Sequence, residues 1–284
     1  MGGTSGHVSL GFAFLLIGLW HLFNCIKLHS LHPKTYITLP WFPISKLRYT
    51  EPILIILVTT IFTSMELSII TSKYLPHIEH SIISTSFFVY AFFGILIDKI
   101  RPPAQHGLVH FLQAIAFSQQ LLILHLHSTD HMGVEGQYHW LLQLVTFVSL
   151  ITTLLAIGYP KSFLNSFIRA FSLVFQGVWL IVIGIMLWTP KFIPRGCFLR
   201  SGFGRDAILC HGERALERAK ALVNIQFGLY LIGLTIFSMS LYLAIFKLYS
   251  EEKIEYQSLS KYEEDHIEEG NCGVEGQTKL CLPM

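Results

Sequence analysis

The sequence is short of charge. Only 13% of its 284 residues are Asp, Glu, Lys or Arg, whereas about 25% of the residues in a soluble domain are charged. So few charges cannot cover a water-facing surface, and a lipid bilayer is therefore the expected solvent for much of the chain. The formal net charge of +2 is too small to indicate a nucleic-acid partner.

Motifs of several large enzyme classes are also missing. The sequence has no Gly-rich phosphate-binding loop, no Walker pattern and no dinucleotide fingerprint. The first apolar run starts at Val8 without a basic segment before it and without a small-x-small cleavage site. We therefore expect this run to be a retained membrane span and not a cleaved signal peptide.

Long apolar runs are what the sequence does contain, and its mean hydropathy is +0.53. A helix needs about 20 mostly apolar residues to cross roughly 30 Å of hydrocarbon, and a helix is required because it satisfies its own backbone polar groups in lipid. Seven runs meet this condition: 8–28, 52–72, 82–100, 108–126, 140–157, 168–188 and 222–248. The prediction is an all-α polytopic membrane protein, with seven transmembrane helices forming one bundle over residues 1–248. The remaining residues, 249–284, are acidic and polar, which predicts a disordered cytosolic tail.

Basic residues in the short loops predict the orientation. Among the first five loops, those after the first, third and fifth runs carry most of the basic residues, whereas the second has only Lys73 and the fourth has none. This alternation places the N-terminus outside or in the lumen and the C-terminus in the cytosol of the endomembrane system or plasma membrane. The basic loop 189–221 argues for the opposite orientation.

Polar residues share one face in several spans, at 100° per residue. Two readings stay open: interhelical hydrogen bonds, or a pathway for a ligand or protons. Glu66 lies deep in the second span, so it needs a histidine partner or a proton of its own. The residues predicted to form this polar interior are His7, His21, Glu66, His106, His110, Gln113, Gln120 and Asn224.

Residues 125–139, "HLHSTDHMGVEGQYH", contain four histidines and one aspartate. His125, His127, Asp130 and His139 supply enough ligands for a tetrahedral zinc site, although their spacing matches no standard zinc motif. The alternatives are a hydrogen-bonded loop, or a cluster that responds to pH because histidine titrates near the pH of acidic secretory compartments.

Two further patterns concern processing. Cys197 and Cys210 lie in loop 189–221, where a disulfide is chemically allowed if the loop faces the lumen. The sequence "YQSL" from Tyr256 to Leu259 fits the tyrosine-x-x-bulky-apolar signal read by clathrin adaptors. This signal needs an extended cytosolic tail.

Three segments carry a resemblance to a known family: "GHVSLGFAFLLIGLWH" at 6–21, "LHLHSTDHMGVEGQYHWLL" at 124–142 and "ERAKALVNIQF" at 217–227. With these, the chain resembles a plant-type member of the transmembrane protein 45 family. The resemblance implies a multi-pass protein of the secretory system with a link to stress or pathogen responses. It supplies no catalytic residues and covers nothing after Leu248.

These observations favour a non-enzymatic function in trafficking, membrane organisation, or the binding of a partner or small ligand. The first alternative is an intramembrane metal-dependent hydrolase with the outer His/Asp site, by analogy with alkaline ceramidases and adiponectin receptors. Those enzymes have paired histidines on the last span, whereas the last span here has Ser238 and Ser240 and no histidine. The second alternative is a proton-coupled carrier that uses Glu66 and the polar face of the fourth span. The sequence leaves the oligomeric state open.

Overall fold

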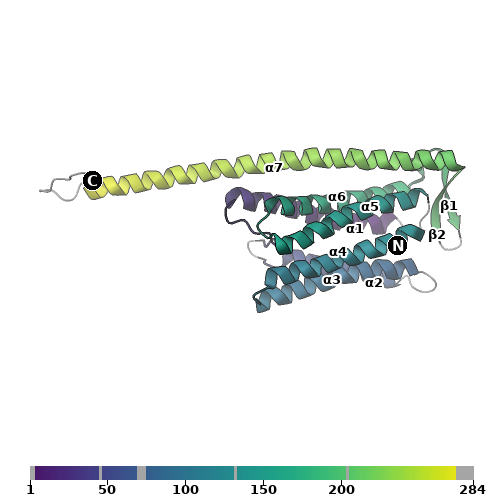
Figure 1. Ribbon diagram of the computed structural model, residues 1–284, viewed down its shortest axis with the longest axis horizontal. Helices are drawn as coiled ribbons and strands as arrows, with labels where there is room; N and C mark the ends of the chain where they lie inside the picture. The colour runs from purple at the N-terminus through teal and green to yellow at the C-terminus, as the bar shows by residue number, and fades with distance from the viewer. Residues whose placement is uncertain (1–3, 45–46, 69–74, 131–132, 203–204, 273–284) are drawn as a thin grey trace.

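A computed structural model describes residues 4–44, 47–68, 75–130, 133–202 and 205–272. Within these residues there are seven α-helices, and each contains a stretch long and apolar enough to cross a membrane. The predicted all-α bundle of seven spans is confirmed (Figure 1). The helices are α1 (Thr4–Leu31), α2 (Thr50–Ser68), α3 (Leu75–Ile100), α4 (Gln105–Asp130), α5 (Val134–Gly158), α6 (Phe163–Trp188) and α7 (Glu213–Cys272).

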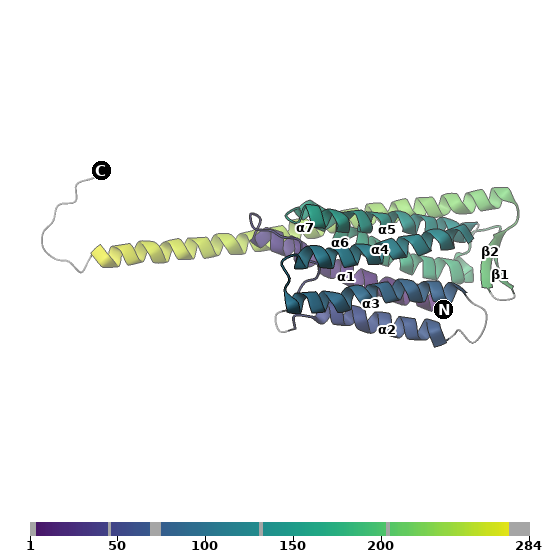
Figure 2. The same ribbon diagram turned by 60° about the horizontal axis from the view of Figure 1, so that its bottom comes forward.

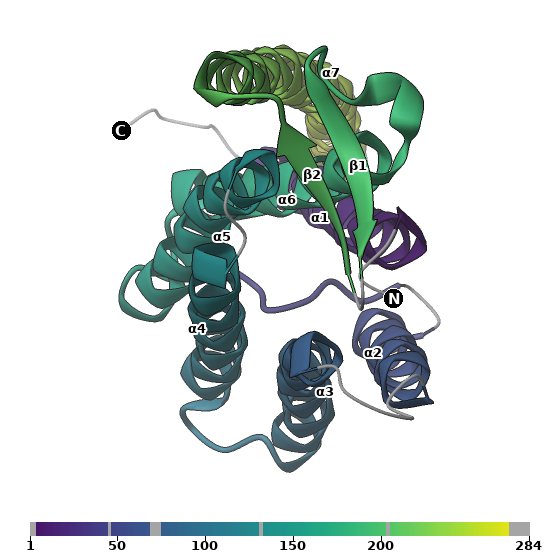
Figure 3. The same ribbon diagram turned by 90° about the vertical axis from the view of Figure 1, so that its right-hand side faces the viewer.

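The bundle has two distinct ends. At the hairpin end, a short 3-10 helix (Pro190–Phe192) leads into an antiparallel hairpin of β1 (Cys197–Gly202) and β2 (Arg205–Cys210), beside the start of α1 (Figures 1 and 3). Cys197 pairs with Cys210 in register and is joined to it by a disulfide. The sequence patterns did not predict this small sheet. The opposite end, called the loop end below, contains residues 32–44 and 47–49 between α1 and α2.

Local sequence explains where the helices end. The two prolines after Arg101 cannot continue α3, and Arg101 itself has a positive φ of 56°. The side chain of Ser162 caps α6 by accepting a hydrogen bond from the Asn165 backbone N–H at 3.2 Å. These signals keep the α3–α4 and α5–α6 connections short, so consecutive helices run antiparallel.

Helices α1 and α6 are in direct backbone contact. A methyl group built on Gly18 would lie 2.5 Å from the backbone nitrogen of Val174, and one on Gly177 would lie 2.3 Å from that of Leu15. Only glycine allows so close an approach. Beside this crossing, Trp179 and Ile183 are fully buried in the main apolar core between α5, α6 and α7.

The α2–α3 hairpin stands apart from α1 (Figure 3). It joins the bundle mainly where α3 packs on α4, and α1 makes hardly any close backbone contact with α2 among the described residues. The space between α1 and α2 is therefore bounded by side chains and not by packed backbones.

Helix α7 has 60 residues, which corresponds to about 90 Å at 1.5 Å per residue. It packs along α1, α5 and α6, and its C-terminal part projects beyond the loop end (Figures 1 and 2). We expected disorder after Leu248, whereas the backbone continues as a helix to Cys272. The segment 250–269 contains no proline or glycine and is rich in Glu, which favours helix. Tyr256–Leu259 lies on helical backbone, and its side chains lie outside the described set, so the adaptor signal stays a prediction.

Candidate functional site

Residues 32–44 fold back into the loop end of the bundle. The Thr38 hydroxyl lies 2.6 Å from that of Ser166, and the Thr38 N–H donates to Pro160 O at 2.7 Å. The Tyr90 hydroxyl donates to Pro40 O at 3.1 Å. Because Phe42 is also buried, backbone polar groups of this segment reach the interior and become partners for buried side chains.

Arg169 is the first of these side chains, and it is 2% exposed. Its Nη2 donates to Leu39 O at 2.9 Å, and its Nη1 donates to His110 Nδ1 at 3.1 Å and to Gln113 Oε1 at 3.5 Å. Sequence reasoning missed Arg169. The available signal was a charged residue within an apolar run, which is costly in lipid unless it faces the bundle interior.

A buried acid and a histidine lie at the same end. Glu51 Oε1 is 2.6 Å from His21 Nε2, and Glu51 Oε2 accepts from the Phe42 N–H at 3.1 Å. Both side chains are almost completely buried. The loop-end cluster therefore consists of His21, Glu51, His110, Gln113 and Arg169.

Tyr36 lies beside this cluster, in the segment between the first two spans. Burial raises the pKa of its phenol to about 12, and the ring packs edge-on against His29 and Phe163. The phenol is therefore neutral at physiological pH.

Three histidines from three different helices meet at the hairpin end. The His7 ring centroid lies 5.8 Å from that of His139 and 6.3 Å from that of His80, and it also contacts Trp188 at 4.9 Å. His139 Nδ1 is 3.0 Å from Glu135 O. We call His7, His80 and His139 the hairpin-end cluster.

Glu66 is completely buried on α2 near the same depth. The hydroxyl of Ser84 donates to Thr59 O at 3.0 Å, which fixes the register of the antiparallel α2–α3 pair. Four residues from Thr59 toward the hairpin end, α2 reaches the level of His80 on α3. Glu66 lies within one further turn of that level.

The predicted zinc ligands do not share one set of contacts. His139 belongs to the hairpin-end cluster, whereas His125 is exposed and its Nδ1 lies 3.2 Å from Gln143 Oε1. The side chains of His127 and Asp130 lie outside the described set. Among the residues that are described, no three His, Cys, Asp or Glu side chains form a group that could hold a metal ion.

Only some of the residues predicted to form a polar interior are buried. His21, Glu66, His110, Gln113 and Gln120 are buried, and His7 is half-buried. Two members are exposed instead. His106 lies at the rim of the loop end, 3.3 Å from Gln105, because it is in the first turn of α4. Asn224 accepts a hydrogen bond from Gln137 at 2.6 Å on the surface between α5 and α7.

Helix α5 carries a buried polar stripe that sequence reasoning missed. Polar residues recur every three or four positions along it, which is the helical period of a single face. The Ser149 hydroxyl lies 2.8 Å from that of Ser172 on α6. The stripe consists of His139, Gln143, Thr146, Ser149 and Thr153, all buried.

A cavity of about 210 Å³ lies between α1, α2, α3, α4 and α6. Its wall is almost entirely apolar, with residues such as Phe14, Phe62 and Phe87. Polar side chains occur toward its two ends, His80 near the hairpin end and Glu51 and Tyr90 near the loop end. This lateral cavity therefore suits an apolar body with a polar end.

The lateral cavity opens toward the lipid phase between α1 and α2. Among the residues that line it, Leu16 on α1 is 66% exposed, and Leu54 and Val58 on α2 are 51% and 36% exposed. An apolar molecule in the bilayer can reach it without passing through water.

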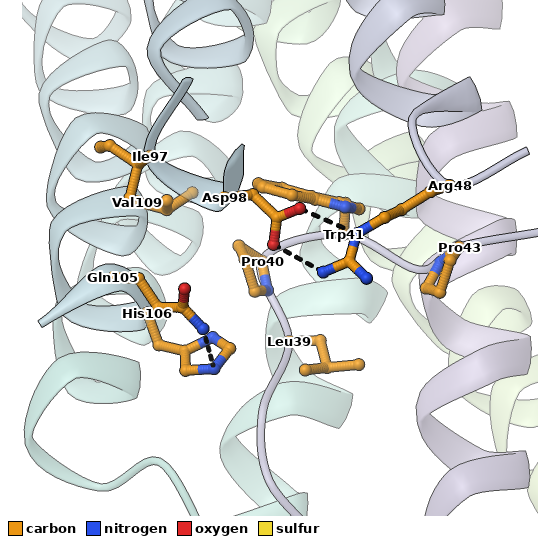
Figure 4. A pocket seen from close by; sticks show the side chains of 10 residues that line it. All are labelled: Leu39, Pro40, Trp41, Pro43, Arg48, Ile97, Asp98, Gln105, His106 and Val109. Atoms are coloured by element: carbon orange, nitrogen blue, oxygen red, sulfur yellow. Dashed lines mark hydrogen bonds and ion pairs between the residues drawn. The ribbon is translucent and has the colours of Figure 1, made fainter. Parts of the chain in front are cut away.

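A smaller pocket of about 140 Å³ lies at the loop end (Figure 4). Arg48 donates two hydrogen bonds to Asp98, both at 2.8 Å, and the Tyr49 hydroxyl donates to Asp98 at 2.9 Å. Hydrogen bonding to Asp98 raises the pKa of Arg48 and that of Tyr49. Trp41 and His106 form other parts of the wall.

No curated protein matches the chain in a sequence search. A family model does match, and the match runs from the first turn of α4 into α7. It contains two of the three segments that carry the resemblance noted above, 124–142 and 217–227. Over residues 106–243 the chain is thus similar to a family of unknown function (DUF716), the family that includes proteins like transmembrane protein 45.

Proposed function

We propose that this multi-pass membrane protein is a non-enzymatic binding protein for an amphipathic molecule of the lipid phase. The lateral cavity is the observation that supports this proposal. Its apolar wall and its opening between α1 and α2 favour a ligand that arrives from the bilayer. Ligand sites are typically concave and mostly apolar, with a few polar groups that fix the orientation.

The shape and lining suggest the ligand class. A cavity of about 210 Å³ holds part of one flexible hydrocarbon chain, whose remainder would stay in the bilayer, and one polar end group would be hydrogen-bonded near Glu51, Tyr90 and Gln113 at the loop end. Fatty acids and long-chain alcohols have this form. Transfer of the hydrocarbon chain from water into an apolar cavity contributes roughly 0.8 kcal/mol per methylene. Transfer from lipid into the cavity contributes much less, because lipid is itself apolar. Specificity therefore rests on the polar end.

Photolabelling tests this proposal. The purified chain in liposomes is irradiated with palmitic acid or palmityl alcohol that carries a diazirine, and the labelled residues are mapped. We expect labels on the cavity-lining faces of α1 and α2. Val58→Trp fills the opening and should remove them, whereas Leu57→Trp, on the neighbouring lipid-exposed position, should leave them unchanged. Equal labelling of the two variants would refute the proposal.

We also propose that the hairpin end faces the lumen or the exterior. The Cys197–Cys210 disulfide supports this, because such bonds persist in oxidising compartments. Lys34, Lys99 and Lys161 flank the loop end, in agreement with the positive-inside rule. With Cys272 and Cys281 replaced by Ser, an impermeant maleimide should label Arg195→Cys on intact cells and Lys161→Cys only after permeabilisation. Labelling of both cysteines from the same side of the membrane would contradict this assignment.

A proton-coupled carrier is the second candidate, favoured by the complete burial of Glu66 near the hairpin-end cluster. Glu66→Gln would then abolish substrate-driven acidification of proteoliposomes. The hydrolase alternative lacks comparable support, because His125 and His139 have different partners. The endomembrane or plasma-membrane location, the link to stress responses and the clathrin adaptor as a partner stay predictions.

A further inference from the structure

We propose that α4, α5 and α6 enclose a file of bound water molecules that conducts protons between the hairpin-end cluster and the loop-end cluster. This activity needs no ligand in the lateral cavity, which shares His80, Glu51 and Gln113 with the two clusters but is lined by no residue of α5. It also differs from the carrier, because it needs no co-transported substrate. Four observations along the α4–α5–α6 interface support it.

The first observation is the length of the polar stripe on α5. From His139 to Thr153 the stripe covers 14 residue steps, or about 21 Å at 1.5 Å per residue. This is most of the roughly 30 Å of hydrocarbon in a bilayer. A stripe that served one local helix contact would not need to extend so far.

The second observation is a pair of amides at mid-depth. Helices α4 and α6 both start at the loop end, and they are in register where Arg169 meets Gln113. Two helical turns further along, each helix carries another glutamine: Gln120 on α4 and Gln176 on α6. These two side chains are 3% and 0% exposed, so both amides are held in the bundle interior.

The third observation is that several buried polar atoms lack protein partners. Among the described residues, neither amide atom of Gln176 has a hydrogen-bond partner, and neither does Oε1 of Gln120. The same holds for Nε2 of His110 and Nε of Arg169. Buried polar groups without partners are strongly unfavourable in an apolar medium, so a small molecule that both donates and accepts is expected there.

The fourth observation concerns the hydroxyls of the stripe. Those of Thr146, Ser149 and Thr153 donate to the carbonyl one turn earlier at 3.0, 3.3 and 2.7 Å. Their donors are thus committed to the helix, while their oxygens keep a lone pair that can accept a hydrogen bond. Water fits this lining, because buried water usually makes about three hydrogen bonds to such groups.

Proton movement through such a file balances without any other reactant. One proton enters at the imidazole of His139, and each water passes a proton to the next oxygen as it receives one. His110, whose Nδ1 accepts from Arg169, donates its Nε2–H to the last water, and that water releases one proton at the loop end. No covalent bond is gained or lost overall. The membrane potential or a pH difference supplies the driving force.

The test uses the full chain in liposomes that contain a pH-sensitive dye, with a potassium gradient and valinomycin to set the potential. Vesicles with the wild-type protein should acidify when valinomycin is added. Vesicles with Gln176→Leu should acidify no faster than protein-free vesicles. Thr146→Val should slow the flux, whereas Thr60→Val, the same change at an exposed position on α2, should not. Each variant is first checked for monodispersity and helix content.

Wild-type flux equal to that of protein-free vesicles would overturn the proposal, and so would unchanged flux in folded Gln176→Leu. Val58→Trp separates this inference from the proposed binding function. That variant should lose photolabelling at the lateral cavity and keep proton flux, so failure of one proposal is visible independently of the other.

Discussion

Arginine occurs in two different settings at the loop end. Arg169 is buried and donates to Leu39 O, His110 and Gln113. Arg48 pairs with Asp98 through two short hydrogen bonds, but its side chain is 54% exposed. Solvent screens the second pair, whereas removal of the first arginine leaves buried acceptors without a donor.

We therefore predict unequal costs for the same substitution. Arg169→Gln should lower the free energy of unfolding by about 1–3 kcal/mol, the range for leaving a buried acceptor without its donor. Arg48→Gln should cost only about 0.2–1 kcal/mol. Unfolding in mixed micelles with increasing denaturing detergent measures both. Equal losses would mean that Arg169 is not buried as described.

A second prediction concerns pH and Tyr36. Burial raises the pKa of its phenol to about 12, compared with about 10 in an unfolded chain. The folded form holds the proton more tightly, so this stabilising contribution is complete below pH ~10 and is lost as the pH rises through the folded-state value of about 12. Tyr36→Phe should therefore flatten the loss of stability over this alkaline range. If the free energy of unfolding fell equally with pH in the wild-type protein and in Tyr36→Phe, other titrating groups would be responsible for the loss.

Sequence reasoning found some interior residues and missed others for a physical reason. His21, Glu66 and His110 stand out because each is polar within an apolar run. Glu51 lies at the start of α2, and its role depends on residues 32–44 folding back so that the Phe42 N–H donates to it. A contact between a loop and a helix cannot be predicted from the spacing of polar residues along one helix.

The α1–α6 pair is the most closely packed element contact in the bundle. Gly177 faces the α1 backbone at a distance that leaves no room for a methyl group. Gly228 on α7, by contrast, has nothing within 4 Å of the position of an added methyl group. The same substitution at the two glycines therefore separates steric cost from helix propensity.

We predict opposite effects at these two positions. Gly177→Ala should destabilise the protein by about 1–3 kcal/mol through overpacking. Gly228→Ala should be neutral, or should stabilise it by up to about 1 kcal/mol because alanine favours helix. Thermal unfolding in detergent compares them. A destabilised Gly228→Ala with an unaffected Gly177→Ala would contradict the described helix crossing.

At the element scale the apolar runs predicted the helices well, because a bilayer constrains length and composition so strongly. The β1–β2 hairpin was not predicted, since its strands are short and held by the Cys197–Cys210 disulfide. The polar stripe on α5 was also missed. Serine and threonine leave a run apolar enough to be recognised as a membrane span. That they share one face of α5 becomes visible only when their spacing of three or four residues is compared with the period of a helix.

At the scale of the whole molecule, the lateral cavity follows from how the helices are grouped. The α2–α3 hairpin packs on α4, and α1 and α2 meet through side chains such as His21 and Glu51 and not through packed backbones. Some residues that line the space between them are exposed to lipid. Composition alone could predict a bundle but not this gap, because it depends on which helices pair. The proposed binding function therefore rests on the arrangement of helices and not on any sequence motif.

Native mass spectrometry of the protein extracted from membranes tests that function most directly. We predict that the wild-type protein and Leu57→Trp carry an additional bound mass in the range of a single-chain amphiphile, and that Val58→Trp does not. The same bound species on Val58→Trp, or no bound species on the wild-type protein, would contradict the account.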